Sequence, residues 1–212
     1  MDETADRKPK RPDNPSLQAL LAACPTFDSI KGWLPLAEAG YLYQLASATE
    51  NGVIVEIGSA FGRSTTALSL GSRAGKGAAV FAVDPHETFT GVLGGQFGPE
   101  NRRAFYQNML AHGGWENVRL INLPSAVVGQ GWQRPIALLW IDGDHAYEAV
   151  ALDLKTWEPH LVPGAKVVFD DAQNPNSGPA RVVQEALASG KYETGPAVGK
   201  TRTLIYRGTP SA

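Results

Sequence analysis

Several features that mark other protein classes are scarce or missing in this chain. Its 212 residues include one cysteine, Cys24, which excludes an internal disulfide and favours a reducing compartment such as the cytoplasm. No apolar run approaches the length of a membrane span, and no apolar signal core stands near the first residue. The formal net charge is only -2, so electrostatics favours neither nucleic acid nor an anionic membrane as a partner.

The length of the chain fits one domain with a full-sized core. Residues 1–15 are charged and proline-rich without an apolar period, and we expect a disordered tail there. Residues 16–212 then form the single domain, in which Cys24 is expected to be a small core residue. Homo-oligomerisation is left open.

Two kinds of apolar pattern alternate along the domain. Apolar runs rich in β-branched residues predict strands at 53–57, 79–83, 118–122, 136–141 and 166–169, with further candidates at 192–194 and 203–206. Helical spacing predicts helices at 16–23, 36–48, 99–112, 147–159 and 179–189, and another after Gly62. A loop with four glycines, 86–98, is long enough to be functional or mobile. The alternation indicates an α/β protein with a doubly wound, mostly parallel sheet and helices on both faces.

The segment from Val53 to Ser64 is the centre of the functional prediction. A buried strand leads into Gly58 and Gly62 and then into a helix, which makes a cradle for a nucleotide-like ligand. The glycine spacing differs from both the dinucleotide fingerprint and the phosphate-binding loop, which disfavours a dinucleotide oxidoreductase. Glu56 precedes the first glycine and would repel a pyrophosphate. It suits a ligand with a cationic group, such as an amino acid moiety.

Acidic residues follow three of the predicted strands, at the edge where such sheets bind ligands. Asp84 ends the second strand, where its carboxylate could accept hydrogen bonds from ribose hydroxyls or simply form a turn. The fourth strand ends in Asp142-Gly143-Asp144-His145 and the fifth in Asp170-Asp171. Carboxylates this close raise one another's pKa, and a hard divalent ion would relieve their repulsion. Asp170 and Asp171 can share an ion only if the strand bends between them. Asp144 also fits a turn or a helix cap.

With these residues the chain resembles class I S-adenosylmethionine-dependent methyltransferases. It is most similar to the metal-dependent O-methyltransferases, the group of catechol O-methyltransferase and the macrocin-type sugar O-methyltransferases. The shared pattern E-x-G-x-x-x-G-x-S stands in register at Glu56, Gly58, Gly62 and Ser64. The resemblance covers about 33–206 and implies a seven-stranded, Rossmann-like sheet that a terminal antiparallel hairpin completes.

The resemblance also implies roles for individual residues. The residues expected to bind S-adenosylmethionine are Glu56, Gly58, Ser59, Gly62, Ser64, Asp84, Ser125, which would contact the adenine, and Asp142. The expected ligands of a divalent metal, magnesium by preference, are Asp142, Asp170 and Asp171. His145 stands at the position of the catalytic base, and Asp144 is the alternative base. Segments before the first strand would close over the cofactor, so Trp33 either lines the site or packs in the core.

We therefore expect an S-adenosylmethionine-dependent, divalent-metal-dependent O-methyltransferase that acts on a hydroxyl of a small molecule or sugar in the cytoplasm. A sugar hydroxyl is preferred over a catechol because a histidine stands at the base position. Two alternatives stay open: a metal-independent methyltransferase of the same fold, and a non-catalytic protein that retains the cofactor pocket. If Gly58 serves close approach to the cofactor, Gly58→Val should abolish S-adenosylmethionine binding and leave the fold largely intact.

Overall fold

The structure, a computed structural model, describes residues 14–92 and 94–208. Most of the predicted tail, residues 1–13, lies outside the described residues. Asn14 caps the first helix, α1 (Pro15–Ala23), because its side chain accepts hydrogen bonds from the backbone N–H groups of Ser16 and Leu17. The first helix therefore begins one residue earlier than predicted.

The described residues form a seven-stranded sheet in the order β5-β2-β1-β6-β7-β9-β8. Its strands are β1 (Val53–Ile57), β2 (Val80–Val83), β5 (Val118–Ile121), β6 (Ile136–Ile141), β7 (Leu161–Phe169), β8 (Tyr192–Thr194) and β9 (Arg202–Tyr206). The pairs from β5 to β7 are parallel, whereas β9 runs antiparallel to both β7 and β8. The predicted doubly wound sheet with a terminal antiparallel hairpin is confirmed.

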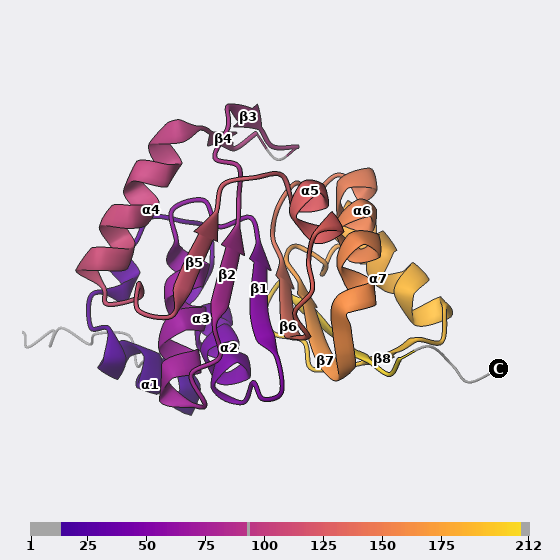
Figure 1. Ribbon diagram of the computed structural model, residues 1–212, viewed down its shortest axis with the longest axis horizontal. Helices are drawn as coiled ribbons and strands as arrows, with labels where there is room; N and C mark the ends of the chain where they lie inside the picture. The colour runs from indigo at the N-terminus through magenta and orange to yellow at the C-terminus, as the bar shows by residue number, and fades with distance from the viewer. Residues whose placement is uncertain (1–13, 93, 209–212) are drawn as a thin grey trace, which may run out of the picture.

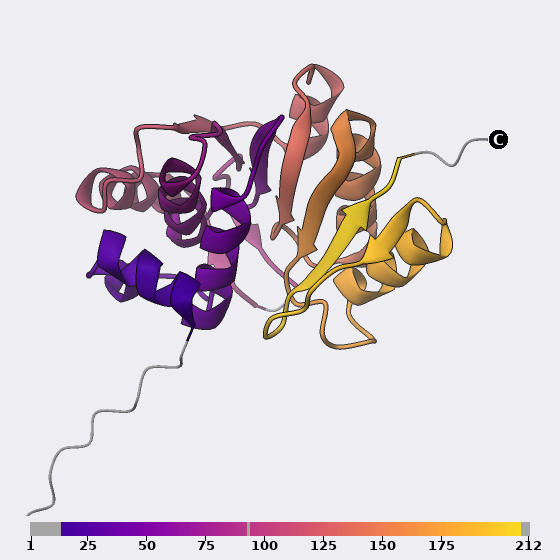
Figure 2. The same cartoon turned by 90° about the horizontal axis from the view of Figure 1, so that it is seen from below.

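Helices cover both faces of this sheet (Figures 1 and 2). One face carries α1, α2 (Leu36–Ser47), α3 (Arg63–Ala74) and α4 (Pro99–Ala111). The other carries α5 (Ser125–Gln130), α6 (Tyr147–Trp157) and α7 (Gly178–Ala188). Two 3-10 turns, η1 (Phe27–Ser29) and η2 (Glu158–His160), complete the helical segments. Helix α5 was not predicted, because its six residues are too few to show a helical period.

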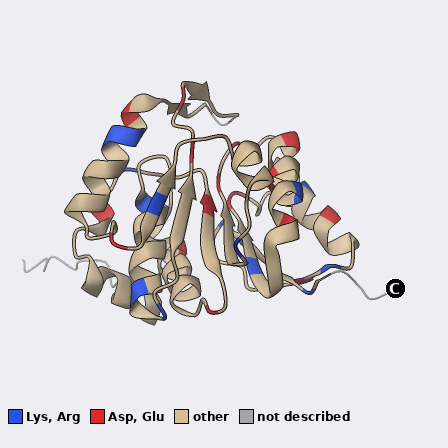
Figure 3. Cartoon of the chain, viewed as in Figure 1, with Lys and Arg blue, Asp and Glu red and all other residues tan. Residues whose placement is uncertain are grey.

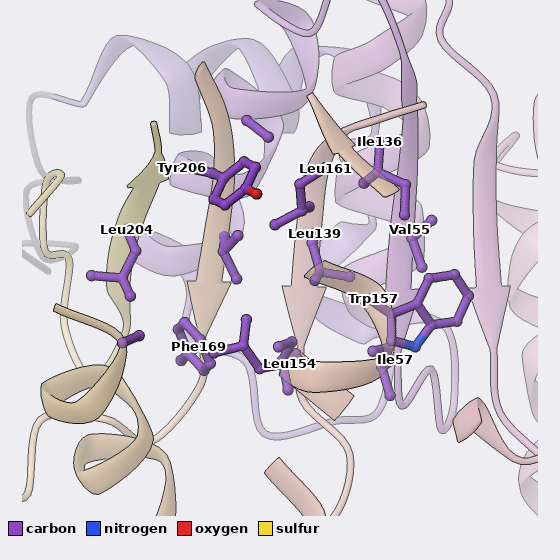
Figure 4. Close-up of a cluster of buried hydrophobic side chains, with 14 of the residues drawn as sticks. Val55, Ile57, Ile136, Leu139, Leu154, Trp157, Leu161, Phe169, Leu204 and Tyr206 are labelled. Carbon is purple, nitrogen blue, oxygen red and sulfur yellow. The ribbon is translucent and has the colours of Figure 1, made fainter. Parts of the chain in front are cut away.

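The central strands are buried on both faces, which explains their nearly continuous apolar sequences. Side chains that alternate along the strands enter two cores. One core packs Val55, Leu139 and Phe169 against Trp157 of α6 (Figure 4), and the other packs neighbouring strand residues against α2 and α3. Cys24 is buried in the second core, as predicted.

The predicted glycine-rich loop contains a short hairpin, β3 (Phe89–Thr90) and β4 (Gln96–Phe97), which lies beyond the carboxyl ends of β1 and β2 (Figure 1). Charged residues of both signs are interspersed over the helices and loops (Figure 3). In the described parts of the chain, none of the helices has the length and apolarity needed to cross a membrane.

Candidate active site

A cavity of about 420 Å³ opens at the carboxyl ends of β1, β6 and β7. This is where the strand order reverses, because β2 and β5 lie on one side of β1 while β6 and β7 lie on the other. The walls come from residues 31–34, the loop after β1, the β3–β4 hairpin, the loops after β6 and β7, and Lys200. The volume lies within the range of small-molecule sites, about 300–1,000 Å³.

Packing requires both glycines of the loop after β1. Gly58 has φ 84°, and a Cβ atom there would collide with the carbonyl oxygen of Asp142. Gly62 has φ 83° and caps α3, and a Cβ atom there would lie 2.9 Å from Cε of Met109 on α4. The expectation that Gly58→Val leaves the fold largely intact is therefore wrong: a side chain would force the loops after β1 and β6 apart.

Asp84 and His86 brace this loop from the end of β2. Asp84 Oδ2 accepts hydrogen bonds from the N–H groups of Ser59 (2.9 Å) and Ala60 (2.8 Å), so the carboxylate holds the loop in shape. His86 lies 2.9 Å from the carbonyl oxygen of Ala60 through Nε2, which must donate, and its Nδ1 accepts from Asn122 at 2.9 Å. This arrangement requires the neutral ring. The sequence contained no signal for the role of His86, which depends on two distant segments.

Glu56 is fully buried beneath α3 and does not line the cavity. Its Oε2 accepts a hydrogen bond from Thr65, while Oε1 has no partner among the described residues. Burial raises the pKa of Glu56 to about 7 against the hydrogen bonds from Ser64 and Thr65. The predicted contact between Glu56 and a cationic ligand group therefore stays a prediction, and this side chain does not face the cavity.

Ser59 and Ser64, by contrast, both line the cavity. The hydroxyl of Ser59 is buried and has no hydrogen-bond partner in the described part of the chain. The first turn of α3 lies beside it, and such helix starts present free N–H groups to anions. This edge of the cavity can therefore accept the carboxylate of an amino acid moiety.

Five side chains meet at the ends of β6 and β7 and form what we call the acidic centre: Asp142, His145, Asp170, Asp171 and Lys200. His145 Nε2 lies 3.3 Å from Asp142 Oδ1, and His145 Nδ1 lies 3.2 Å from Asp171 Oδ2. Lys200 Nζ lies 2.6 Å from Asp170 Oδ2 and 3.2 Å from Asp171 Oδ1. Asp171 has φ 47°, so the chain bends after β7 in the way that two adjacent aspartates need to face one site.

The charges of the acidic centre shift the pKa values of its own side chains. Burial and the charge of Asp170 raise the pKa of Asp142 well above its ordinary value. Burial alone would lower the pKa of His145, but the hydrogen bond and charge of Asp142 outweigh it, and the pKa is raised. The pKa of Lys200 is raised in the same way, because the charge of Asp170 outweighs burial. The protein therefore stabilises positive charge here.

The donor set fits a hard divalent cation. One ligand atom from each of Asp142, His145 and Asp170 lies within 4.8 Å of the others. Asp170 Oδ1 is buried and has no partner within the described residues, so one carboxylate oxygen still lacks a hydrogen bond or a cation. Asp171 faces the same cavity but stands outside this closest group, in which His145 takes the place predicted for Asp171.

Lys200 lines the cavity but was not predicted from the sequence. It stands in the connection between β8 and β9, about 30 residues from Asp170, and a lysine after glycine carries no motif. Glu38 of α2 positions it, since Glu38 Oε1 accepts a hydrogen bond from the backbone N–H of Lys200 at 2.8 Å. Burial raises the pKa of Glu38 to about 7, although the backbone hydrogen bond favours its charged form.

Aromatic side chains line the mouth of the cavity. Trp33, which is 59% exposed, lies 5.9 Å from Phe61 and 5.6 Å from Phe97 between ring centroids. Arg63 fixes the segment that carries Trp33, because it donates hydrogen bonds to the carbonyl oxygens of Ile30 (2.7 Å) and Leu34 (2.9 Å). Of the two roles considered for Trp33, the structure favours a place at the site.

Ser125 and Asp144, like Glu56, Gly62 and Asp84, are predicted site residues that do not line the cavity. Ser125 starts α5, and its hydroxyl accepts a hydrogen bond from Nε1 of Trp157 at 2.8 Å. Asp144 accepts a hydrogen bond from the N–H of Ala146 at 3.2 Å, which is the turn-forming role considered for it. Asp144 is thereby less suited than His145 to act as a base at the cavity, and the adenine contact of Ser125 stays a prediction.

Comparison with solved structures supports the fold. The SAH-bound methyltransferase PaMTH1 of Podospora anserina is 15% identical with a TM-score of 0.66, over 90% of this chain and 88% of its own. An O-methyltransferase of Bacillus cereus in complex with SAH is 15% identical with a TM-score of 0.63, over 92% of both chains. CalS11, a TDP-rhamnose 3'-O-methyltransferase, is 20% identical with a TM-score of 0.59, over 89% of this chain and 91% of its own.

The family comparison addresses the sequence directly. Residues 55–172 match the model of a methyltransferase domain. The matched segment runs from β1 to just beyond Asp171, and so contains both the glycine loop and the four acidic-centre residues other than Lys200. Since this match spans more than half of the chain, the protein belongs to the methyltransferase-domain family, as its resemblance to class I S-adenosylmethionine-dependent methyltransferases predicted.

Proposed function

We propose that this protein is an O-methyltransferase that transfers a methyl group from S-adenosylmethionine to a hydroxyl of a small molecule. The observation that carries the proposal is the acidic centre, which brings a histidine and three aspartates to one cavity beside the glycine loop. Two relatives of the same fold contain SAH, the demethylated form of this donor, and a third is a sugar O-methyltransferase.

The cavity offers opposite charges to the two ends of an amino acid moiety. Ser59, Ser64 and the first turn of α3 would hold its carboxylate, while Asp142 would face its ammonium group. Asp84 acts on this site through the loop, whose N–H groups of Ser59 and Ala60 it holds. When bound, S-adenosylmethionine supplies an electrophilic methyl group.

The acidic centre would place and activate the acceptor. When bound, a divalent cation such as magnesium supplies positive charge that lowers the pKa of a neighbouring hydroxyl. Asp142 and Asp170 would hold that cation, with Asp171 completing the set. His145 would take the proton of the acceptor hydroxyl at Nε2, once Asp142 turns from this nitrogen to the cation, while Asp171 beside Nδ1 would orient the ring. Most of the rate then comes from positioning and charge neutralisation.

The acceptor is expected to have a ring with an apolar face. Trp33, Phe89 and Phe97 line the same cavity as the acidic centre, and aromatic faces bind the apolar faces of sugars and of phenols. We retain a sugar or other small-molecule hydroxyl as the acceptor, with a catechol as the alternative.

A metal-independent methyltransferase is the second candidate, and the position of Lys200 favours it. The ammonium group already contacts Asp170 and Asp171, so it neutralises part of the charge that a metal ion would neutralise.

Methyl transfer from labelled S-adenosylmethionine to a panel of sugars, catechols and phenols tests the proposal. We expect transfer to a hydroxyl, its loss after verified metal removal, and its recovery on addition of magnesium. Undiminished transfer in excess chelator would support the metal-independent candidate. An absence of transfer to every acceptor, despite cofactor binding, would support a binding protein without turnover.

A further inference from the structure

Lys200 provides the acidic centre with a cation of its own. Its Nζ lies 2.6 Å from Asp170 Oδ2 and 3.2 Å from Asp171 Oδ1. The side chain of Asp170 is only 4% exposed, so solvent and salt screen this ion pair weakly. The carboxylate proposed to hold a divalent cation is therefore already occupied by an ammonium group.

The backbone beneath this ammonium group is clamped. Glu38 accepts the N–H of Lys200, and the following residue, Thr201, is buried and donates its hydroxyl to the carbonyl oxygen of Val198 at 2.8 Å. Gly199 has φ 53°, and a Cβ atom there would collide with the Glu38 carboxylate, so the clamp requires a glycine. The loop thus holds Lys200 beside the aspartates without help from the ammonium group.

The side chain above this clamp has room to move. Lys200 lines the cavity, and its side chain is 18% exposed. Four rotatable bonds separate the fixed backbone from Nζ, so the ammonium group can turn into the cavity while the loop stays in place.

We propose that Lys200 is an internal competitor of the divalent cation, which occupies Asp170 in the metal-free protein and has to leave it when the cation binds. This inference rests on the metal site of the proposed function. The competition follows from geometry: a cation on either oxygen of Asp170 would lie beside an ammonium group that is 2.6 Å from one of them. The protein would bind a divalent cation more weakly than its three aspartates alone would.

The test is a calorimetric titration of the full chain with Mn²⁺, without donor or acceptor. Lys200→Met removes the charge and keeps most of the side-chain volume. Loss of one charge-assisted hydrogen bond from the competing state should tighten Mn²⁺ binding by about tenfold to a hundredfold. Lys200→Arg, which keeps the charge, should retain the weak affinity of the unmodified protein.

Lys31→Met is the matched control. Lys31 lines the same cavity, but its Nζ lies 4.5 Å above the ring of Phe61 rather than at the aspartates. Its removal changes the net charge by the same amount, so an affinity within about threefold of the unmodified protein separates local competition from the long-range charge effect. Equal tightening in both methionine variants would refute the competition.

The outcomes also separate this inference from the metal site itself. If the unmodified protein and Lys200→Met bind Mn²⁺ equally, or the variant binds it more weakly, the competition is wrong and the metal site stands. If neither protein binds Mn²⁺ at millimolar concentration, the metal site fails, and the competition with it.

A measurement on the unmodified protein covers the case in which the variants fail to fold. An ion-paired ammonium group gives a ¹⁵N–¹H signal that exchanges slowly with water. Saturation with Mg²⁺ should abolish or shift this signal of Lys200, whereas an unchanged signal in the Mg²⁺-saturated protein would overturn the proposal.

Discussion

The burial of Glu56 beneath α3 should make the free energy of unfolding depend on pH. The carboxyl group is fully buried, and burial raises its pKa from 4.5 to about 7. In the unfolded chain the proton leaves near the ordinary value, so between these two pH values the folded state holds more protons. The free energy of unfolding therefore falls as the pH rises through this window, and the loss is complete above it.

The size of the effect follows from the two pKa values. A difference of about 2.5 pH units corresponds to about 3 kcal/mol, of which about 2.5 kcal/mol appears between pH 5 and pH 8. Glu56→Gln cannot ionise and should not show this loss. Its stability relative to the unmodified protein should therefore improve by about 2 to 3 kcal/mol between pH 5 and pH 8.

Urea denaturation followed by circular dichroism, on both proteins at pH 5, 6, 7 and 8, measures this difference. Comparison across pH cancels the cost of accommodating the amide, which is the same at each pH. A stability difference that stays constant from pH 5 to pH 8 would refute the reasoning. Because Glu56 does not line the cavity, donor affinity in the folded variant should change little, and a large loss would restore its predicted role as a direct ligand contact.

Two further variants test the site itself. His145→Ala should lower kcat by about a hundredfold or more, the usual scale of general base catalysis, with donor affinity nearly unchanged. Asp144→Asn is its control, since this carboxylate caps a turn outside the cavity, and an inactive Asp144→Asn beside an active His145→Ala would reverse the two roles. Trp33→Ala should raise the KM for the acceptor several-fold without lowering the melting temperature, because this side chain is 59% exposed at the mouth of the cavity. An unchanged KM would remove Trp33 from the acceptor site.

Much of the architecture could be predicted from local pattern. Each central strand is a short apolar run that ends at an acidic or glycine residue, and six of the seven predicted strands recur within two residues at each end: 53–57, 79–83, 118–122, 136–141, 192–194 and 203–206. These patterns are readable because the strands are buried on both faces. Strand β7 begins at Leu161, five residues before the predicted start, and its first residues include Pro163 and Gly164, which read as a turn.

Most of the acidic centre could be predicted from the sequence. Asp142, His145, Asp170 and Asp171 were predicted to meet because parallel strands bring their carboxyl ends to one edge, and all four line the cavity. The prediction required a bend in the chain that turns both adjacent aspartates toward this site. The sequence does not show that bend, whereas the positive φ of Asp171 in the structure does.

Tertiary structure alone decided what each group faces. Whether a glycine contacts a ligand or another loop depends on segments distant in sequence, and for Gly58 the neighbour is the carbonyl group of Asp142. His86 and Glu38 act by bracing backbone from other parts of the chain. Lys200 reaches the aspartates because β9 returns antiparallel beside β7 and brings the preceding loop to the end of that strand. The local sequence determined the strands and the residue types at their ends, whereas the pairing of charges across the cavity followed from the order in which the strands assemble.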